Sequence, residues 1–204
     1  MAEGLRELKR RAARRAMENA AVDLAYDEGV RAVTVERVCA AAMVSRSTFF
    51  NYFTSLEQAI FGAALEYDPA LTDRILARYP DDLVVAASVI VMESVRGADD
   101  AMTRRRLALF TREPGTTSAV SWASHESRER LIAVIAAWLD AHPERARLTD
   151  ADHATEARLT VAFAIALGDE VQRDAREVDG DVRIDPETFR AVRRRMAAIS
   201  AAAE

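Results

Sequence analysis

One stretch of the sequence, residues 33–56, restricts the fold more than any other part of the chain. It reads V-T-V-E-R-V-C-A-A-A-M-V-S-R-S-T-F-F-N-Y-F-T-S-L, which predicts two short helices separated by a three-residue turn. The second helix combines a polar outer face with the aromatic residues Phe49 and Phe53 on its inner face. A short rigid helix of this kind suits the major groove of DNA, which admits one α-helix. The stretch therefore predicts DNA recognition by a helix-turn-helix and no catalytic chemistry.

The composition favours helix along the whole chain. Of the 204 residues, 50% are hydrophobic, about one fifth are alanine, and only seven are glycine and five proline. A chain of this length can bury a sizeable core in one or two domains, and no alternation typical of strands occurs. We therefore predict an all-α fold. A helix-turn-helix DNA-binding domain is expected over residues 1–55 and a larger helical domain over residues 56–204, linked by a fourth helix from about residue 55.

Capping residues mark where the N-terminal helices begin. A first helix is expected over about residues 5–28, and Gly29 stands where a helix C-terminus favours glycine. Gln58 follows a serine by three residues, which is the spacing of a capping box. The N-cap positions of the next three helices are occupied by Thr34, Ser45 and Ser55. Four helices within about sixty residues are expected to form a compact N-terminal unit.

The later helices are also predicted from their first residues. The pairs that open them are Asp68-Pro69, Asp81-Asp82, Thr149-Asp150 and Asp185-Pro186. The helix after Asp82 is almost wholly apolar and must be buried on most sides. The helix after Asp150 is expected to extend to about Arg176.

The charges are unevenly distributed along the chain. The net charge is −5, which argues against a general polyanion binder. Residues 1–55 contain nine basic and seven acidic side chains, whereas residues 56–204 contain nineteen basic and twenty-six acidic ones. Six basic residues precede the helix-turn-helix: Arg6, Lys9, Arg10, Arg11, Arg14 and Arg15. They form either a segment that faces DNA phosphates or a solvated helix face.

Several classes of function find no support in the sequence. No run of about 18 apolar residues predicts a membrane span, and the N-terminus has no apolar segment typical of an export signal, so we expect a cytoplasmic protein. The single cysteine, Cys39, excludes a disulfide framework and is expected to be a small buried side chain. No nucleophile, P-loop or dinucleotide-binding motif occurs, so we predict no enzyme activity and no cofactor. His153 and Glu156 have the spacing of two metal ligands, but one pair is not a metal site.

Two motifs and the helix after them carry a family resemblance. The first is M-E-N-A-A-V-D-L-A-Y-D-E-G-V-R-A-V-T-V, the second is V-S-R-S-T-F-F-N-Y-F-T-S, and an acidic-apolar fourth helix follows. Residues 17–61 thereby resemble the DNA-binding domain of TetR-family transcriptional regulators. The resemblance implies a bacterial homodimer that binds a double-stranded DNA operator, and a repressor released from a pseudo-palindrome by a small-molecule effector. The alternative is a helical protein-interaction module that does not bind DNA.

The resemblance also implies roles for individual residues. Positions that contact phosphates in relatives are occupied by Thr34, Ser45, Thr48 and Tyr52, and positions that face the bases by Arg46, Ser47, Phe50 and Asn51. A guanidinium at Arg46 can bind guanine O6 and N7, whereas hydroxyls fix the register on phosphates without reading sequence. Met43 departs from the family, because it occupies a turn position where relatives have glycine. Either its backbone is strained or the turn has another shape.

The later helices show no family-wide sequence pattern, so their sites are predicted from residue type. The apolar residues of the central helices are expected to be core residues first, some of which line a cavity. The candidate ligand-binding residues are Met92, Glu93, Phe110, Trp122, His125, Trp138 and Phe163. Glu93 lies in an apolar helix, where its carboxylate either pairs with an arginine such as Arg106 or binds a polar ligand group. His125 is either exposed or a donor in the pocket. The last two long helices are implied to pair between subunits through Leu159, Phe163, Leu167, Phe189, Val192 and Met196.

Overall fold

Helices dominate the protein. The computed structural model describes residues 4–96, 101–113, 124–173, 176–178, 181–183 and 186–200. Nearly all regular structure within these residues is helical, so the all-α fold class is confirmed. The exception is a short antiparallel hairpin of β1 (Arg176–Val178) and β2 (Asp181–Arg183). The sequence analysis missed this hairpin because strands of three residues are too short for an alternating pattern to be recognised.

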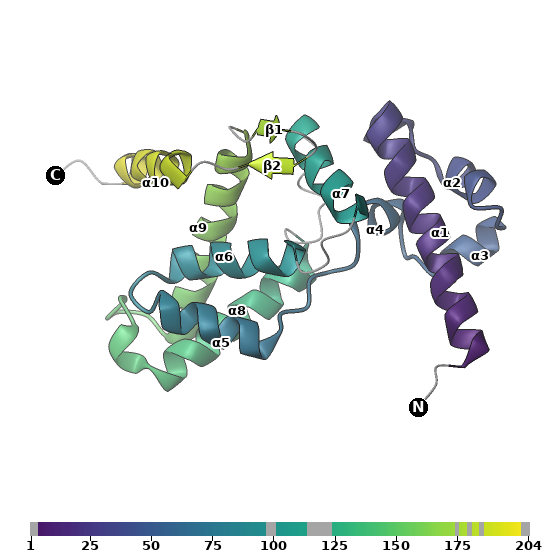
Figure 1. The fold of residues 1–204 in the computed structure, drawn as a ribbon. Helices are drawn as coiled ribbons and strands as arrows, with labels where there is room; N and C mark the ends of the chain where they lie inside the picture. The colour runs from purple at the N-terminus through teal and green to yellow at the C-terminus, as the bar shows by residue number, and fades with distance from the viewer. Residues whose placement is uncertain are drawn as a thin grey trace.

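The first helices form an N-terminal unit, residues 4–61, that packs around α1 (Figure 1). Its elements are α1 (Leu5–Glu28), the 3-10 turn η1 (Val30–Ala32), α2 (Val35–Ala41), α3 (Arg46–Phe50) and α4 (Leu56–Phe61). The predicted bounds of the first helix and its end at Gly29 are confirmed; Gly29 adopts a φ of 88°. Met17 and Ala21 of α1 pack with Phe49 and Ile60, all fully or almost fully buried. α1 is thus the support on which the helix-turn-helix rests.

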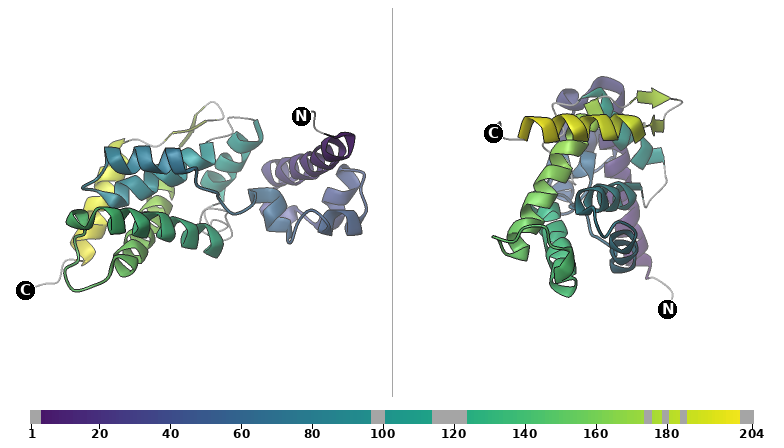
Figure 2. Two further views of the ribbon diagram at one scale, coloured as in Figure 1. Left: turned by 90° about the horizontal axis from the view of Figure 1, so that it is seen from below. Right: turned by 90° about the vertical axis from the view of Figure 1, so that its left-hand side faces the viewer.

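A larger group of helices follows, and four of them form a C-terminal bundle (Figures 1 and 2). The elements are α5 (Pro69–Arg78), α6 (Leu83–Arg96), α7 (Ala101–Arg112), α8 (His125–Ala141), the 3-10 turn η3 (Pro143–Arg145), α9 (His153–Arg173) and α10 (Pro186–Ser200). The bundle of α5, α6, α8 and α9 buries a core that includes Leu76, Ile90, Ile135 and Val161. α10 packs on α9 and projects from its end. None of the described helices is long and apolar enough to cross a membrane.

The bounds of the longest helix of the bundle differ from those predicted. α9 begins at His153 rather than near Thr149, because Asp152 accepts a hydrogen bond from the amide of Thr155 at 2.7 Å and acts as the cap. It ends at Arg173, three residues before the predicted end, where the chain enters the hairpin. The start predicted at Asp68-Pro69 is confirmed, since Asp68 caps α5 with Pro69 in its first turn. Asp185, predicted to open the last helix, lies outside the described residues.

α7 joins the N-terminal unit to the rest of the chain (Figure 1). Arg106 donates hydrogen bonds to the carbonyls of Ile60, at 2.7 Å, and Ala59, at 3.2 Å, near the end of α4. Glu113, just after α7, accepts a hydrogen bond from the amide of Val30 at 3.0 Å. Leu109 is buried in the core of the N-terminal unit. A shift of α7 would therefore act directly on the helices that support the helix-turn-helix.

Candidate nucleic-acid interface

Local capping defines the two helices of the helix-turn-helix. The hydroxyl of Thr34 accepts a hydrogen bond from the amide of Arg37 at 3.3 Å, and α2 begins at the next residue. The hydroxyl of Ser45 accepts from the amide of Thr48 at 3.0 Å and lies 2.8 Å from the Thr48 hydroxyl. Both caps agree with the prediction. They satisfy amides that a helix N-terminus leaves without partners, and so fix where each helix starts.

The helix after the recognition helix is capped slightly differently from the predicted capping box. Ser55 accepts from the amide of Gln58 at 3.2 Å, as expected. The amide oxygen of Gln58 returns to the N–H of Thr54 at 2.8 Å, one residue before the N-cap. The connection between α3 and α4 is still held at both ends, so the orientation of α3 is fixed relative to α4.

Aromatic residues divide α3 into an inner and an outer side. Phe49 and Phe53 are 0% and 1% exposed, and their ring centroids lie 5.1 Å apart. Phe50, the neighbour of Phe49, is 47% exposed and meets the Phe49 ring edge-on. The predicted core role of Phe49 and Phe53 is confirmed. Because these two rings are anchored against α1, the opposite side of α3 faces outward.

Every residue predicted to contact DNA lies at the surface of this outer side or beside it. Six are exposed: Thr34, Ser45, Arg46, Ser47, Phe50 and Asn51. Thr48 and Tyr52 are half-buried, and Tyr52 also packs against the core of the N-terminal unit. The eight residues thus lie on α3, on the two residues that follow it, and at the N-caps of α2 and α3.

The turn before α3 keeps the geometry that favours glycine, with methionine in that position. Met43 has a φ of 53°, and it is the one non-glycine residue with positive φ among the described residues. Its side chain is 92% exposed and gains no packing there. Of the two alternatives for Met43, the strained backbone is therefore the one adopted.

Charged side chains connect α2 to its surroundings. Arg46 at the start of α3 donates a hydrogen bond from Nη1 to Oε1 of Glu36 at 2.5 Å. Arg37 donates to Glu28 at the end of α1, and this hydrogen bond lowers the pKa of the Glu28 carboxyl. Arg37 also donates to the carbonyl of Ala32 at 2.9 Å. The sequence analysis identified Arg46 but did not predict that Glu36 would hold it.

Two further predictions concern residues close to the interface. Cys39 on α2 is buried as expected, and burial raises the pKa of its thiol. The six basic residues of α1, from Arg6 to Arg15, are all exposed. The N-terminal turns of α1 extend past α3 (Figure 1). This position suits a segment that approaches phosphates, although a solvated face would look the same.

The predicted ligand-binding residues are not brought together into one site. Trp122 lies outside the described residues, and the side chain of Phe110 is not described. Met92 is half-buried on α6, and Trp138 packs on the core of the C-terminal bundle. Phe163 belongs to a separate apolar cluster between α9 and α10. Of the apolar candidates whose side chains are described, only Met92 and Trp138 therefore remain on the bundle outside this cluster.

Two of these expectations need correction. Glu93 is exposed, so its carboxylate is hydrated and needs no arginine partner inside the bundle; Arg106 is bound to the carbonyls near the end of α4 instead. The side chain of His125 is 90% exposed at the start of α8, so of its two alternatives the exposed one is adopted and not the pocket donor. The apolar pattern placed Glu93 on the correct helix, but it did not indicate which face of that helix is covered.

The remaining histidines have local partners. His142 stacks on Trp138 with the ring centroids 3.8 Å apart. His153 pairs with Asp140 at 2.8 Å. Its predicted partner Glu156 is buried and accepts hydrogen bonds from the amides of Arg147 and Leu148. Within the part of the chain that the structure describes, no group of three or more His, Cys, Asp or Glu residues could hold a metal ion.

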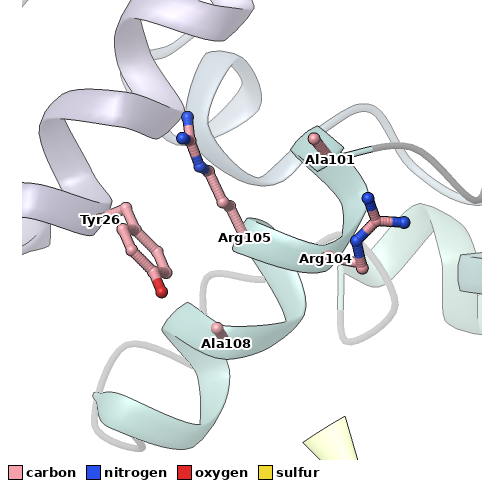
Figure 3. Close-up of a pocket in the computed structure, with 5 residues that line it drawn as sticks. All are labelled: Tyr26, Ala101, Arg104, Arg105 and Ala108. Atoms are coloured by element: carbon pink, nitrogen blue, oxygen red, sulfur yellow. The ribbon is translucent and has the colours of Figure 1, made fainter. Parts of the chain in front are cut away.

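The structure contains a small pocket that the sequence did not indicate. It measures about 190 Å³, lies between α1 and α7, and is lined by Tyr26, Ala101, Arg104, Arg105 and Ala108 (Figure 3). Arg105 is paired with Asp23, and Arg104 points away from Tyr26. The polar groups that line the pocket do not point towards a common centre, so we propose no ligand for it.

Several predicted dimer residues contribute to packing within the chain. Leu167 and Val192 are almost fully buried between α9 and α10, with Phe163, Phe189 and Met196 partly buried around them. Leu159, in contrast, is 57% exposed. Burial of Leu167 and Val192 within one chain leaves little of these two side chains for a partner.

Two capped short helices, buried anchors behind the second helix and an exposed polar face in front of it define the class of protein. It is a helix-turn-helix DNA-binding protein. Residues 19–59 match the family model described as bacterial regulatory proteins of the TetR family. The chain is also 30% identical over 181 residues to the HTH-type transcriptional regulator TcmR of Streptomyces glaucescens, covering 84% of this chain and 76% of TcmR. The chain therefore belongs to the TetR family, whose members are transcriptional regulators and not enzymes.

Solved structures with the same fold are more distant in sequence. FadR of Thermus thermophilus, a TetR-family transcriptional repressor in complex with lauroyl-CoA, is 19% identical. The match covers 94% of this chain and 96% of FadR with a TM-score of 0.50. A regulator of Syntrophomonas wolfei assigned to the TetR family is 12% identical over 95% of this chain and 98% of its own, also with a TM-score of 0.50. At these identities the likeness concerns the fold.

Proposed function

We propose that this regulator is a repressor that binds a pseudo-palindromic operator as a homodimer and is released by a small-molecule effector. The observation that carries the proposal is the outer side of α3, where an exposed arginine and asparagine lie above two buried phenylalanines. Two such heads related by two-fold symmetry would meet half-sites about 34–36 Å apart. In this arrangement the acidic remainder of the chain would point away from the DNA and limit non-specific binding.

The eight surface residues would make two kinds of contact with DNA, to phosphates and to bases. The hydroxyl-bearing residues Thr34, Ser45, Thr48 and Tyr52 would bind phosphates and set the register. Arg46 and Asn51 carry the side chains that bind guanine and adenine edges, respectively, while Phe50 offers an apolar contact to a thymine methyl group. Ser47 would add a neutral hydrogen bond to a base edge. The DNA-binding domain would include α4, because Ala59, Ile60 and Phe61 pack in the core of the N-terminal unit. We therefore place the domain boundary after α4 rather than at residue 55.

The effector would bind in the C-terminal bundle. The hydroxyl of Tyr67 and the indole N–H of Trp138 are buried and have no hydrogen-bond partner among the described residues, and both side chains pack on the bundle core. A buried polar atom without a partner is unfavourable, so a ligand with an acceptor group would satisfy either one. Met92 on α6 would contribute apolar contact. The related fold of FadR holds lauroyl-CoA, which supports an apolar ligand class for this region.

The homodimer would form on α9 and α10. Leu159 of α9 and Ile199 of α10 are large apolar side chains that are more than half exposed. Exposed apolar groups on the last two helices favour a subunit interface there. Phe163, Phe189 and Met196 are only partly buried and could contribute their remaining surface.

The proposal is tested by footprinting the purified protein on the DNA that flanks its own gene, across a salt series. We expect a protected pseudo-palindrome whose occupancy decreases as salt rises, because bound phosphates release counterions. Arg46→Ala should reduce the preference for one base pair per half-site by roughly ten-fold or more, within the 1–3 kcal/mol of a good bidentate contact. Tyr52→Phe should weaken binding to all sequences alike. Failure to select any sequence, from flanking or random DNA, would contradict operator binding.

A further inference from the structure

An acidic side chain lies within the face proposed to read bases. Glu36 is in the first turn of α2, and its Oε1 accepts a hydrogen bond from Nη1 of Arg46 at 2.5 Å. The two side chains are 63% and 66% exposed, so both are accessible to a bound duplex. The Arg46 guanidinium also lies 5.6 Å from the centre of the exposed Phe50 ring. A carboxylate here is unfavourable beside a phosphate backbone unless a cation or a base amine compensates it.

We propose that Glu36 is a specificity-determining residue that acts with Arg46 as one paired unit. This inference rests on the proposed function, in which Arg46 faces the bases. The contact to Glu36 uses one of the five N–H donors of the guanidinium, so the others remain available for guanine O6 and N7. It also uses one carboxylate oxygen, and the other can accept a hydrogen bond from the N4 amine of cytosine. The pair therefore selects a guanine with a cytosine close by.

The pair also explains how Arg46 avoids non-specific contacts. An unpaired arginine binds any phosphate, whereas an arginine that shares its charge with a carboxylate gains less from doing so. An exposed ion pair contributes little to folding stability, so removal of Glu36 should leave the fold intact. The effect of Glu36 is therefore expected in DNA selectivity and in the salt dependence of binding, and not in protein stability.

The experiment compares four proteins on a random duplex pool: the parent, Glu36→Ala, Glu36→Gln and Glu57→Ala. Glu57 is the matched control, because it is an exposed acidic residue in the first turn of α4 and its removal changes the net charge equally. We expect Glu36→Ala to lose the preference for cytosine beside the guanine by about ten-fold, and to bind unrelated duplexes more tightly. Glu36→Gln should lose the cytosine preference as well, since its amide can also donate to other bases. Glu57→Ala should keep the parental preference.

A second set of variants, made in an Arg46→Ala protein, tests whether Glu36 acts together with Arg46 or independently of it. In that protein, the arginine that holds Glu36 is absent, so adding Glu36→Ala should change the cytosine preference less than it does in the parent. Thermal unfolding of each variant checks that the fold is retained.

Three outcomes decide the proposal. A loss of the cytosine preference in both Glu36 variants but not in Glu57→Ala supports it. Equal changes in Glu36→Ala and Glu57→Ala, or tighter binding to all sequences with unchanged preference, overturns it while leaving operator binding intact. If the parent itself enriches no sequence, operator binding fails, and the role of Glu36 fails with it.

Discussion

The connections between helices are held differently in the N-terminal unit and in the C-terminal bundle. Before α3 and α4, the serine that accepts a hydrogen bond and the amide that donates it are three residues apart. In the bundle, local caps also occur, but connecting segments depend on distant side chains. The amide of Leu65 donates to Ser127 and its carbonyl accepts from Arg130, 62 and 65 residues away. Local sequence therefore encodes the helix-turn-helix, whereas the shape of the C-terminal bundle depends on how the whole chain packs.

The largest effect should come from the aromatic anchor of α3. Phe49→Ala removes a fully buried ring and should lower the free energy of unfolding by about 3–5 kcal/mol. The adjacent substitution Phe50→Ala is the matched control; its ring is about half exposed, so the change should stay within about 0.5 kcal/mol. Urea unfolding measures both. Similar losses at the two positions would mean that α3 has no inner and outer side.

A second substitution tests the distant contacts of the bundle. Glu156→Ala removes the carboxylate that accepts from the amides of Arg147 and Leu148 and should cost about 2–3 kcal/mol, because two amides lose their acceptor. Glu170→Ala, on an exposed turn of the same helix, should change stability by less than about 0.5 kcal/mol. Chemical denaturation again provides the measurement. A neutral effect of Glu156→Ala would show that water replaces the carboxylate.

These contrasts explain what the sequence could and could not predict. Thr34 and Ser45 were identified as caps because the amides they satisfy lie at a fixed offset along the chain. Glu156 was considered only for its metal-ligand spacing from His153, since nothing local indicates that the preceding loop folds back onto its carboxylate. The exposure of Glu93 was missed for a related reason. Helical periodicity shows which residues share one face of a helix. Whether another helix packs on that face depends on residues far away in the sequence.

The effector region can be probed through the ionisation of Tyr67. Burial raises the pKa of Tyr67 to about 12, whereas a tyrosine in the unfolded chain has a pKa of about 10. Between these two values the folded protein keeps the Tyr67 proton, whereas the unfolded chain has lost it. The free energy of unfolding is therefore highest below pH 10 and decreases as the pH rises towards 12. At pH 11 this loss should be on the order of 1 kcal/mol.

Phenylalanine does not ionise, so Tyr67→Phe should remove the loss of stability that comes from this hydroxyl at alkaline pH. The free energy of unfolding should therefore decrease less between pH 9 and pH 11 than it does in the parent. At neutral pH the variant should be equally stable or more stable by about 1 kcal/mol, since a buried hydroxyl without a partner is removed. Urea titrations at the two pH values measure both effects. A variant that is markedly less stable at neutral pH would indicate that the hydroxyl has a partner in the folded protein.

The smallest effect concerns the backbone of the turn before α3. Met43 holds a φ of 53°, which is unfavourable by about 1–2 kcal/mol for any residue with a Cβ atom. Glycine relieves this strain, but it also gives the unfolded chain more freedom, so Met43→Gly should stabilise the protein by only about 0.5–1 kcal/mol. Met43→Ala keeps the Cβ atom and should give no gain; little packing is lost in either variant because the side chain is 92% exposed.

Urea unfolding and operator affinity, measured on both Met43 variants, separate stability from function. If Met43→Gly is more stable and binds DNA as tightly as the parent, the caps at Thr34 and Ser45 are sufficient to orient α3. If it is more stable but binds more weakly, the strained methionine restricts the turn to the pose that reads DNA. A less stable glycine variant would contradict the local account of this region. The N-terminal unit would then resemble the bundle, with its turn held by contacts beyond its own residues.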